Sequence, residues 1–131
     1  MKKTVLIVDD DPIVRLVIQR MIHNLDSSVN CLQGDNGAVG LALLETLQNS
    51  TDAIVVLLDI NMPVLNGWEF LESLEKINLG PFNKLQLCIV TSSTDDCDNL
   101  KAQSYSLINK VYHKPLSKLD IEEILDLHET T

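Results

Sequence analysis

The sequence predicts an α/β fold in which strands and helices alternate around a parallel sheet covered on both faces, a doubly wound (βα)5 arrangement. Three observations lead to this prediction. Residues 55–58 are apolar throughout, as in a strand with helices on both sides, and the run stops at Asp59. A second such run, residues 5–8, stops at Asp9, and strand-like and helix-like segments alternate along the rest of the chain.

The first strand–helix unit is predicted from residues 4–8 and the segment that follows them. Asp11 is suited to cap a helix whose first turn contains Pro12, where the missing N–H has no partner to lose. Apolar side chains at helical spacing give this helix one core-facing stripe, made of Val14, Val17, Ile18, Met21 and Leu25.

The second unit begins with a short strand at residues 29–33, and Asp35 or Asn36 is expected to cap its helix. The apolar side chains of that helix are Val39, Leu43, Leu44 and Leu47. Residues 53–58 form the third and most hydrophobic strand, so we expect this strand to lie at the centre of the sheet.

The second half of the chain repeats the pattern. After a loop at residues 62–67, a third helix is marked by Trp68, Leu71, Leu74 and Ile77. Residues 85–90 form the fourth strand, residues 95–104 a polar helix, and residues 111–113 a very short fifth strand. Ser117 is suited to cap the last helix, whose apolar face carries Ile121, Ile124, Leu125 and His128.

Length and composition limit the possible functions. The 131 residues fit a single domain with a core at about residues 3–127, and no linker or output domain is recognised. Ten Lys+Arg against nineteen Asp+Glu give a formal charge of −9, which argues against nucleic-acid binding. Three cysteines without a CxxC pair, and no apolar run long enough for a signal peptide or membrane span, favour a cytoplasmic protein.

Polar side chains follow four of the predicted strands, at the point where each strand ends. Asp9 and Asp10 follow the first strand, Asp59 the third, Thr91 the fourth and Lys114 the fifth. Right-handed crossovers between parallel strands place all of them at one edge of the sheet. Converging carboxylates need a cation, and oxygen ligands favour Mg²⁺. Acids, a hydroxyl and a lone ammonium together suit phosphoryl transfer.

These segments resemble the receiver domains of two-component response regulators (CheY-like). The resemblance extends from Lys3 to about Leu127 and rests on four matching segments: Val8-Asp9-Asp10-Asp11-Pro12, residues 58–67 (Leu-Asp-Ile-Asn-Met-Pro-Val-Leu-Asn-Gly), Val90-Thr91-Ser92 and His113-Lys114-Pro115. It implies a flavodoxin-like fold with strand order 2-1-3-4-5 and a single-domain regulator in a phosphorelay. The order of the four motifs makes the resemblance specific, because any one of them alone would be weak.

The resemblance also implies a role for each residue of the acidic group. Asp59 corresponds to the phosphoacceptor. Asp9 and Asp10 correspond to the acidic pair that, with Asp59 and the backbone carbonyl of Asn61, holds Mg²⁺. One member of the pair would bind the ion directly and the other through water.

Residues of the later motifs are implied to respond to the phosphoryl group. Thr91 corresponds to the switch hydroxyl, and Lys114 to the lysine that contacts the phosphoryl oxygens. Pro115 follows this lysine as it usually does in the family, where the peptide bond between them can be cis. Gly67 ends the motif that begins at Leu58.

The pattern departs from the family in the fifth strand. Most receivers carry a Tyr or Phe three residues before the lysine, and this chain has Val111 there, with Tyr112 one place later. Alternation along a strand directs these two side chains to opposite faces of the sheet. The usual aromatic switch is therefore in question. Tyr105 is either an alternative aromatic residue on an output face with Val111 and Tyr112 or a residue that covers the core.

The leading interpretation is a receiver that takes a phosphoryl group from a sensor histidine kinase or phosphotransfer protein and signals by contact with a downstream protein. It is not expected to be an enzyme or to bind nucleic acid or membrane. A phosphatase of the haloacid-dehalogenase type also uses an aspartyl nucleophile, but after its first strand, whereas Asp59 follows the third. A receiver-like binding module that works without phosphorylation is the second alternative.

Overall fold

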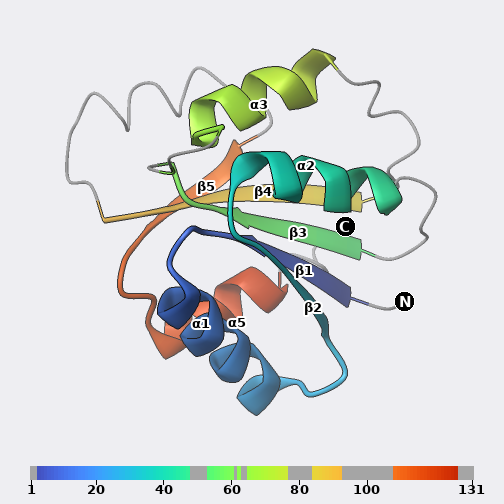
Figure 1. Cartoon of the computed structure of the whole chain (residues 1–131). Helices are drawn as coiled ribbons and strands as arrows, with labels where there is room; N and C mark the ends of the chain where they lie inside the picture. The colour runs from blue at the N-terminus through green and yellow to red at the C-terminus, as the bar shows by residue number, and fades with distance from the viewer. Residues whose placement is uncertain are drawn as a thin grey trace.

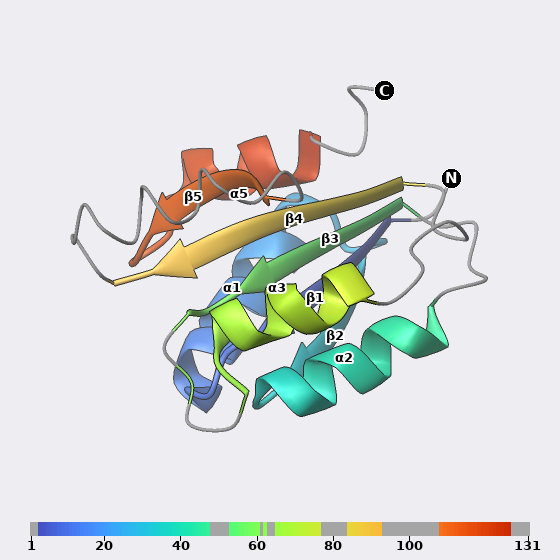
Figure 2. The same ribbon diagram turned by 90° about the horizontal axis from the view of Figure 1, so that it is seen from above.

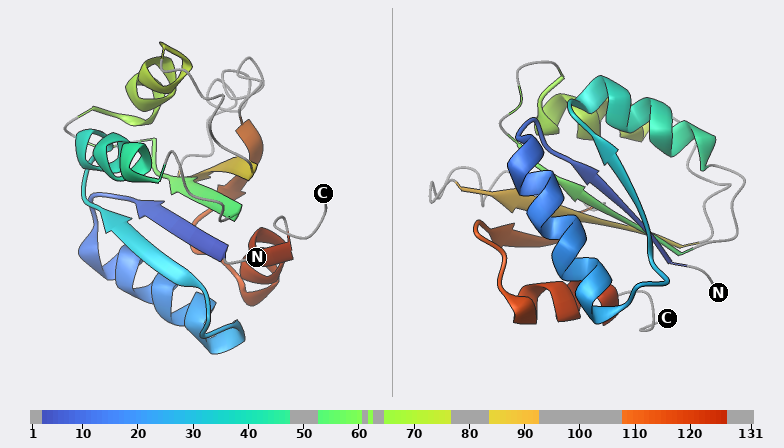
Figure 3. Two further views of the ribbon diagram at one scale, coloured as in Figure 1. Left: turned by 90° about the vertical axis from the view of Figure 1, so that its right-hand side faces the viewer. Right: turned by 60° about the horizontal axis from the view of Figure 1, so that its bottom comes forward.

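A computed structural model of the protein describes residues 3–47, 53–60, 62, 65–76, 84–92 and 108–126. Within these residues the strands form one parallel sheet in the order β2-β1-β3-β4-β5, so the predicted topology is confirmed (Figure 1). Their bounds are β1 Lys3–Val8, β2 Asn30–Gly34, β3 Ala53–Leu58, β4 Lys84–Thr91 and β5 Ile108–His113. Figure 3 shows β2 at one edge of the sheet and β5 at the other.

The described helices cover both faces of the sheet (Figures 1 and 2). Helices α1 (Pro12–Leu25) and α5 (Lys118–Asp126) lie on one face, and α2 (Gly37–Thr46) and α3 (Gly67–Lys76) lie on the other. The helix predicted at residues 95–104 lies outside the described residues. Among the described helices, every one is too short or too polar to span a bilayer.

Two hydrophobic cores result because successive residues of a strand point to opposite faces. In β1, Val5 and Ile7 join the core beneath α1 and α5, whereas Leu6 and Val8 join the core beneath α2 and α3. Strand β3 is completely buried along its length, which confirms its central position. A strand buried on both faces explains why residues 53–58 show no alternation of apolar and polar residues.

Side chains cap the helices where the sequence predicted. The Asp11 carboxylate accepts hydrogen bonds from the backbone N–H groups of Ile13 and Val14 at 2.9 and 3.5 Å. Asn36, rather than Asp35, caps α2. Ser117 and Asp120 form a reciprocal capping box at the start of α5, with N–H to side-chain oxygen distances of 2.9 and 3.0 Å.

The predicted buried stripe of α1 was partly wrong. Val17 and Leu25 are 49% and 36% exposed, whereas Ile22, which the prediction omitted, is fully buried with Ile18. The buried stripe therefore follows Ile18 and Ile22, one helical turn apart. Val17 and Leu25 instead contribute apolar area to the surface of α1.

Strand β5 is longer than predicted, because it begins at Ile108 instead of Val111. The first half of β5 was not predicted because it is polar. The pairing of β5 with β4 shifts register between Leu87 and Cys88. Val111 is half-buried against the core beneath α2 and α3, while Tyr112 is 3% exposed in the core beneath α1 and α5. The predicted opposite orientation of these two side chains is confirmed.

Candidate functional site

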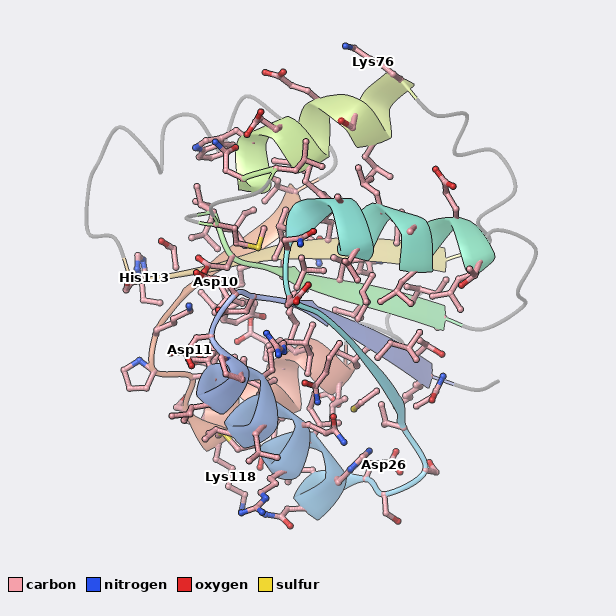
Figure 4. All side chains as sticks on the ribbon, in the orientation of Figure 1. Asp10, Asp11, Asp26, Lys76, His113 and Lys118 are labelled. Atoms are coloured by element: carbon pink, nitrogen blue, oxygen red, sulfur yellow. The ribbon has the colours of Figure 1, made fainter. Side chains whose placement is uncertain are left out.

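Three carboxylates meet at the carboxyl edge of the sheet. Asp9 and Asp59 are buried, at 2% and 5% exposure, and Asp10 is exposed at the rim. One ligand oxygen from each lies within 4.8 Å of the other two. Figure 4 shows Asp10 and His113, the last residue of β5, on the side of the molecule where the strands end, far from Lys76 and Asp26.

Backbone hydrogen bonds hold the two buried acids in place. The N–H of Asp59 donates to the carbonyl of Val8 at 2.9 Å, and the N–H of Asp9 donates to the carbonyl of Gly34 at 3.1 Å. These bonds continue the pairing of the strands by one residue beyond their ends. The Asp9 carboxylate also accepts a bond from the N–H of Asp11 at 2.9 Å. The sheet itself therefore sets where the carboxylates lie.

Lys114 lies between the buried acids. Its Nζ is 2.7 Å from Asp9 Oδ2 and 3.5 Å from Asp59 Oδ2, with its side chain 19% exposed. Burial alone would lower the pKa of Lys114, but the hydrogen bond to Asp9 and the charges of Asp59 and Asp9 outweigh burial and raise it. Lys114 is therefore a fixed cation among the acids. We call the four residues Asp9, Asp10, Asp59 and Lys114 the acidic edge.

Thr91 is joined to the acidic edge through the backbone. It is the last residue of β4, is 1% exposed, and pairs with His113. Its carbonyl accepts a hydrogen bond from the N–H of Lys114 at 2.9 Å. The Lys114–Pro115 peptide bond is cis. The residues predicted at the strand ends, all of which the structure describes, are thus brought together at one edge of the sheet.

Gly67 is needed for the close approach of α3 to the strand end that carries Asp59. A Cβ at this position would lie 2.7 Å from the Cα of Ile60 and 2.9 Å from the carbonyl oxygen of Asp59. Asn66, just before it, forms a reciprocal capping box with Glu69 in the first turn of α3, with N–H to side-chain oxygen distances of 2.9 and 3.0 Å. Sequence reasoning missed this box, although Asn-x-x-Glu before an apolar helix was a usable signal.

Sequence reasoning also missed Arg15. Its Nη1 donates to the backbone carbonyl of Asp9 at 2.6 Å, which brings a second cation to the acidic edge. Two predicted residues, Asn61 and Tyr105, lie outside the described residues. Tyr112 lies in the core beneath α1 and α5, with Lys110 Nζ 5.0 Å from the centre of its ring.

The donor set fits Mg²⁺. The ion prefers oxygen ligands, commonly one or two carboxylates together with water, and Asp9, Asp10 and Asp59 provide three carboxylates around one point. Because Asp10 is exposed, such an ion could keep several water ligands. The structure is thus an α/β domain whose strand-end edge holds two buried carboxylates, a third exposed one and a fixed lysine, an arrangement compatible with a divalent cation.

Comparison with known proteins identifies the family. The family model described as response regulator receiver domain matches residues 5–126, so the chain belongs to this family. Two similar curated proteins are the nitrate/nitrite response regulator protein NarL of Escherichia coli (34% identical over 76 residues, 58% of this chain and 33% of that protein) and the sensor histidine kinase CheAY of Helicobacter pylori (33% over 97 residues, 74% and 11%). The chain therefore spans a third or less of the length of these relatives.

Solved structures agree on the fold. A two-component response regulator from Cytophaga hutchinsonii matches with a TM-score of 0.87 and 25% identity over the full length of both chains. A response regulator from Legionella pneumophila matches with a TM-score of 0.82 and 23% identity, covering 99% of this chain and all of that one. The chain is therefore a receiver domain of two-component systems, with the CheY-like flavodoxin fold that the sequence predicted.

Proposed function

We propose that this receiver accepts a phosphoryl group on Asp59 in the presence of Mg²⁺ and signals through protein contacts, as a cytoplasmic signalling module and not as an enzyme. The observation that supports this most strongly is the acidic edge. Three carboxylate oxygens within 4.8 Å would accommodate a divalent ion, and Lys114 Nζ lies 3.5 Å from Asp59. The relatives include a sensor histidine kinase, which fits a kinase or phosphotransfer protein as donor.

In the proposed reaction, a carboxylate oxygen of Asp59 attacks the phosphorus of a donor phosphohistidine. A P–O bond to Asp59 forms, the P–N bond breaks, and the departing imidazole takes up a proton. Bound Mg²⁺ would offset the negative charge that gathers between the carboxylates and the phosphoryl oxygens. Lys114 supplies a positive charge at the same edge, already held in place by Asp9.

Phosphorylation would then change the interactions of Lys114 and Thr91. The acyl phosphate adds about 1.5 to 2 negative charges beside Asp9 and Asp10. Lys114 would turn from the carboxylates toward the phosphoryl oxygens, and the Thr91 hydroxyl would bond another of them. Since the N–H of Lys114 is bonded to the carbonyl of Thr91, movement at one of these residues is transmitted to the other.

An apolar groove beside the acidic edge suits the docking of the phosphodonor protein. It has a volume of about 370 Å³ and runs from α1 to the segment after β5, lined by Ile13, Val14, Val17, Ile18, Met21, Lys114, Pro115 and Leu116. Of these lining residues, Ile13 and Val17 are 70% and 49% exposed. An exposed apolar surface next to a reactive group provides affinity for a partner that brings its phosphohistidine to Asp59.

Mass spectrometry of the intact protein after treatment with acetyl phosphate tests the proposal. We expect a phosphoryl adduct on the wild type with Mg²⁺ and no adduct either without Mg²⁺ or on Asp59→Asn. Lys114→Ala should still be labelled but should show a weaker conformational response by NMR. An adduct of equal yield on Asp59→Asn would reject the assignment of the phosphoacceptor.

Val111 supports one other candidate, a binding module that works without phosphorylation. The position that carries a swivelling aromatic residue in most receivers holds a half-buried valine that packs on the core. If Mg²⁺ binds but acetyl phosphate leaves no adduct, this alternative is favoured. An adduct that leaves the affinity for a downstream protein unchanged would also favour it.

A further inference from the structure

A polar network connects the acidic edge to α1 and β2. Arg15 Nη1 donates to the backbone carbonyl of Asp9 at 2.6 Å, and Arg15 Nε donates to Gln33 Oε1 at 3.1 Å. The Gln33 side-chain amide in turn donates to Gln19 Oε1, one turn further along α1. The guanidinium is thus fixed from two sides, by the end of β1 and by β2.

The carbonyl that Arg15 holds belongs to the peptide unit between Asp9 and Asp10. Asp9 is then restrained at its N–H by Gly34, at its carboxylate by Asp11 and Lys114, and at its carbonyl by Arg15. Fixing this peptide plane also fixes the direction in which the chain enters Asp10. Asp10 is exposed at the rim, where a side chain has few packing contacts to orient it.

We propose that Arg15, held by Gln33, is a positioning residue that orients the Asp9 and Asp10 carboxylates for a divalent cation. This inference rests on the metal site of the proposed function. Geometry and charge make opposite predictions for its removal. The arginine charge repels a cation, so electrostatics alone predicts tighter binding without it, whereas loss of the fixed peptide predicts weaker binding.

Isothermal titration of the metal-free protein with Mg²⁺ distinguishes the two. We expect Arg15→Ala to weaken Mg²⁺ binding by about tenfold, as for the loss of other groups that orient metal ligands. Gln33→Leu leaves every charge in place and removes only the anchor of the guanidinium, so we expect a smaller loss of about threefold. Arg15→Lys keeps the charge but cannot bond Asp9 and Gln33 with one planar group, so its affinity should fall between wild type and Arg15→Ala.

Arg20→Ala is the matched control, because it removes the same charge from an exposed position on the same helix. It should leave the Mg²⁺ affinity within about twofold of wild type, since a distant exposed charge is screened by salt. The amide resonance of Asp10, which belongs to the peptide that Arg15 holds, should shift in metal-free Arg15→Ala and not in Arg20→Ala. Urea unfolding in EDTA measures the stability of each metal-free variant. The same measurement in excess Mg²⁺ without EDTA then shows how much stability the ion adds.

The outcomes separate this inference from the proposed function. If the wild type binds no Mg²⁺, the metal site of the proposed function is rejected. If the wild type binds Mg²⁺ and Arg15→Ala binds it equally or more tightly, the positioning role is overturned while the metal site stands. Wild-type affinity in Gln33→Leu, with weakened binding in Arg15→Ala, would overturn the part assigned to Gln33.

Discussion

The acidic edge buries charged side chains, whereas the layer between β5 and α5 leaves its charged side chains at the surface. At the acidic edge, the carboxylates of Asp9 and Asp59 are buried and held by backbone bonds and Lys114. In the layer formed by Lys110, Tyr112 and Glu123, which we call the β5–α5 layer, the charged pair lies at the surface with both side chains 47% exposed. Its buried member is the neutral Tyr112, whose hydroxyl has no hydrogen-bond partner in the described residues.

This difference in buried charge is what we expect if the acidic edge binds an ion and the β5–α5 layer only packs. Buried like charges destabilise a fold unless cations offset them, so under the proposed function the acidic edge would trade some stability of the metal-free protein for Mg²⁺ binding. The β5–α5 layer contains a neutral ring and an exposed ion pair, which need no ligand. We therefore expect changes at the acidic edge to alter both Mg²⁺ affinity and stability, and changes in the β5–α5 layer to alter stability alone.

The largest effect is expected from Gly67→Ala, which forces the support of Asp59 to move. Its Cβ would lie 2.7 Å from the Cα of Ile60, and the backbone cannot move aside as the end of a flexible side chain can. We expect a loss of about 3 kcal/mol in the free energy of unfolding and weaker Mg²⁺ binding. Gly34→Ala is the control, with its nearest backbone atom, Gly40 N, at 3.2 Å and an expected loss of about 1 kcal/mol. Urea unfolding measures both, and equal losses would contradict this reading of the contacts.

Asp10→Asn should stabilise the metal-free protein while weakening Mg²⁺ binding. Removing one of three clustered carboxylates relieves repulsion of about 1 kcal/mol. Asp11→Asn is a matched control, because it removes the same charge one residue later and asparagine also caps helices well. Urea unfolding in EDTA and calorimetric Mg²⁺ titration test the pair. The two variants should differ in Mg²⁺ affinity; if they bind the ion equally, Asp10 has no special role.

The two regions also differ in how far the sequence predicted them. Asp9 and Asp59 were placed correctly because each ends an apolar run, a signal contained within a few consecutive residues. The start of β5 at Ile108 was missed because Asn109 and Lys110 are polar and the pairing shifts register opposite Leu87 and Cys88. Bulges depend on the neighbouring strand, which local periodicity does not contain.

The contribution of Arg15 could not be predicted for a related reason. Its partners are a backbone carbonyl in the loop after β1 and Gln33, eighteen residues away on β2. Such contacts arise only when the strands are paired. Ile22 shows the same limit, because which of several apolar faces of α1 is buried depends on how α5 packs beside it. The sequence therefore predicted the order of the elements and the positions of the strand-end residues better than it predicted side-chain partners.

Tyr112→Phe should stabilise the protein and leave Mg²⁺ affinity unchanged. Removing a buried hydroxyl without a partner should raise the free energy of unfolding by about 1 kcal/mol. Burial, together with the nearby Cys88 and Glu123, raises the pKa of Tyr112 above its usual value, so the neutral ring is favoured in the folded state. As the pH rises through 10 the unfolded wild type ionises first, and the advantage of Phe should grow. A constant difference from pH 8 to 10.5 would contradict this.

The smallest effect is expected from the ion pair between Lys110 and Glu123. Both side chains are half exposed, so water screens their attraction, and a double-mutant cycle of Lys110→Met and Glu123→Gln should give a coupling of about 0.5 kcal/mol. The coupling should vanish in 1 M NaCl, where the Debye length is about 3 Å. None of the three variants should change Mg²⁺ affinity. If one does, the β5–α5 layer is coupled to the acidic edge through β5, the strand that Lys114 follows, and the two regions are not independent.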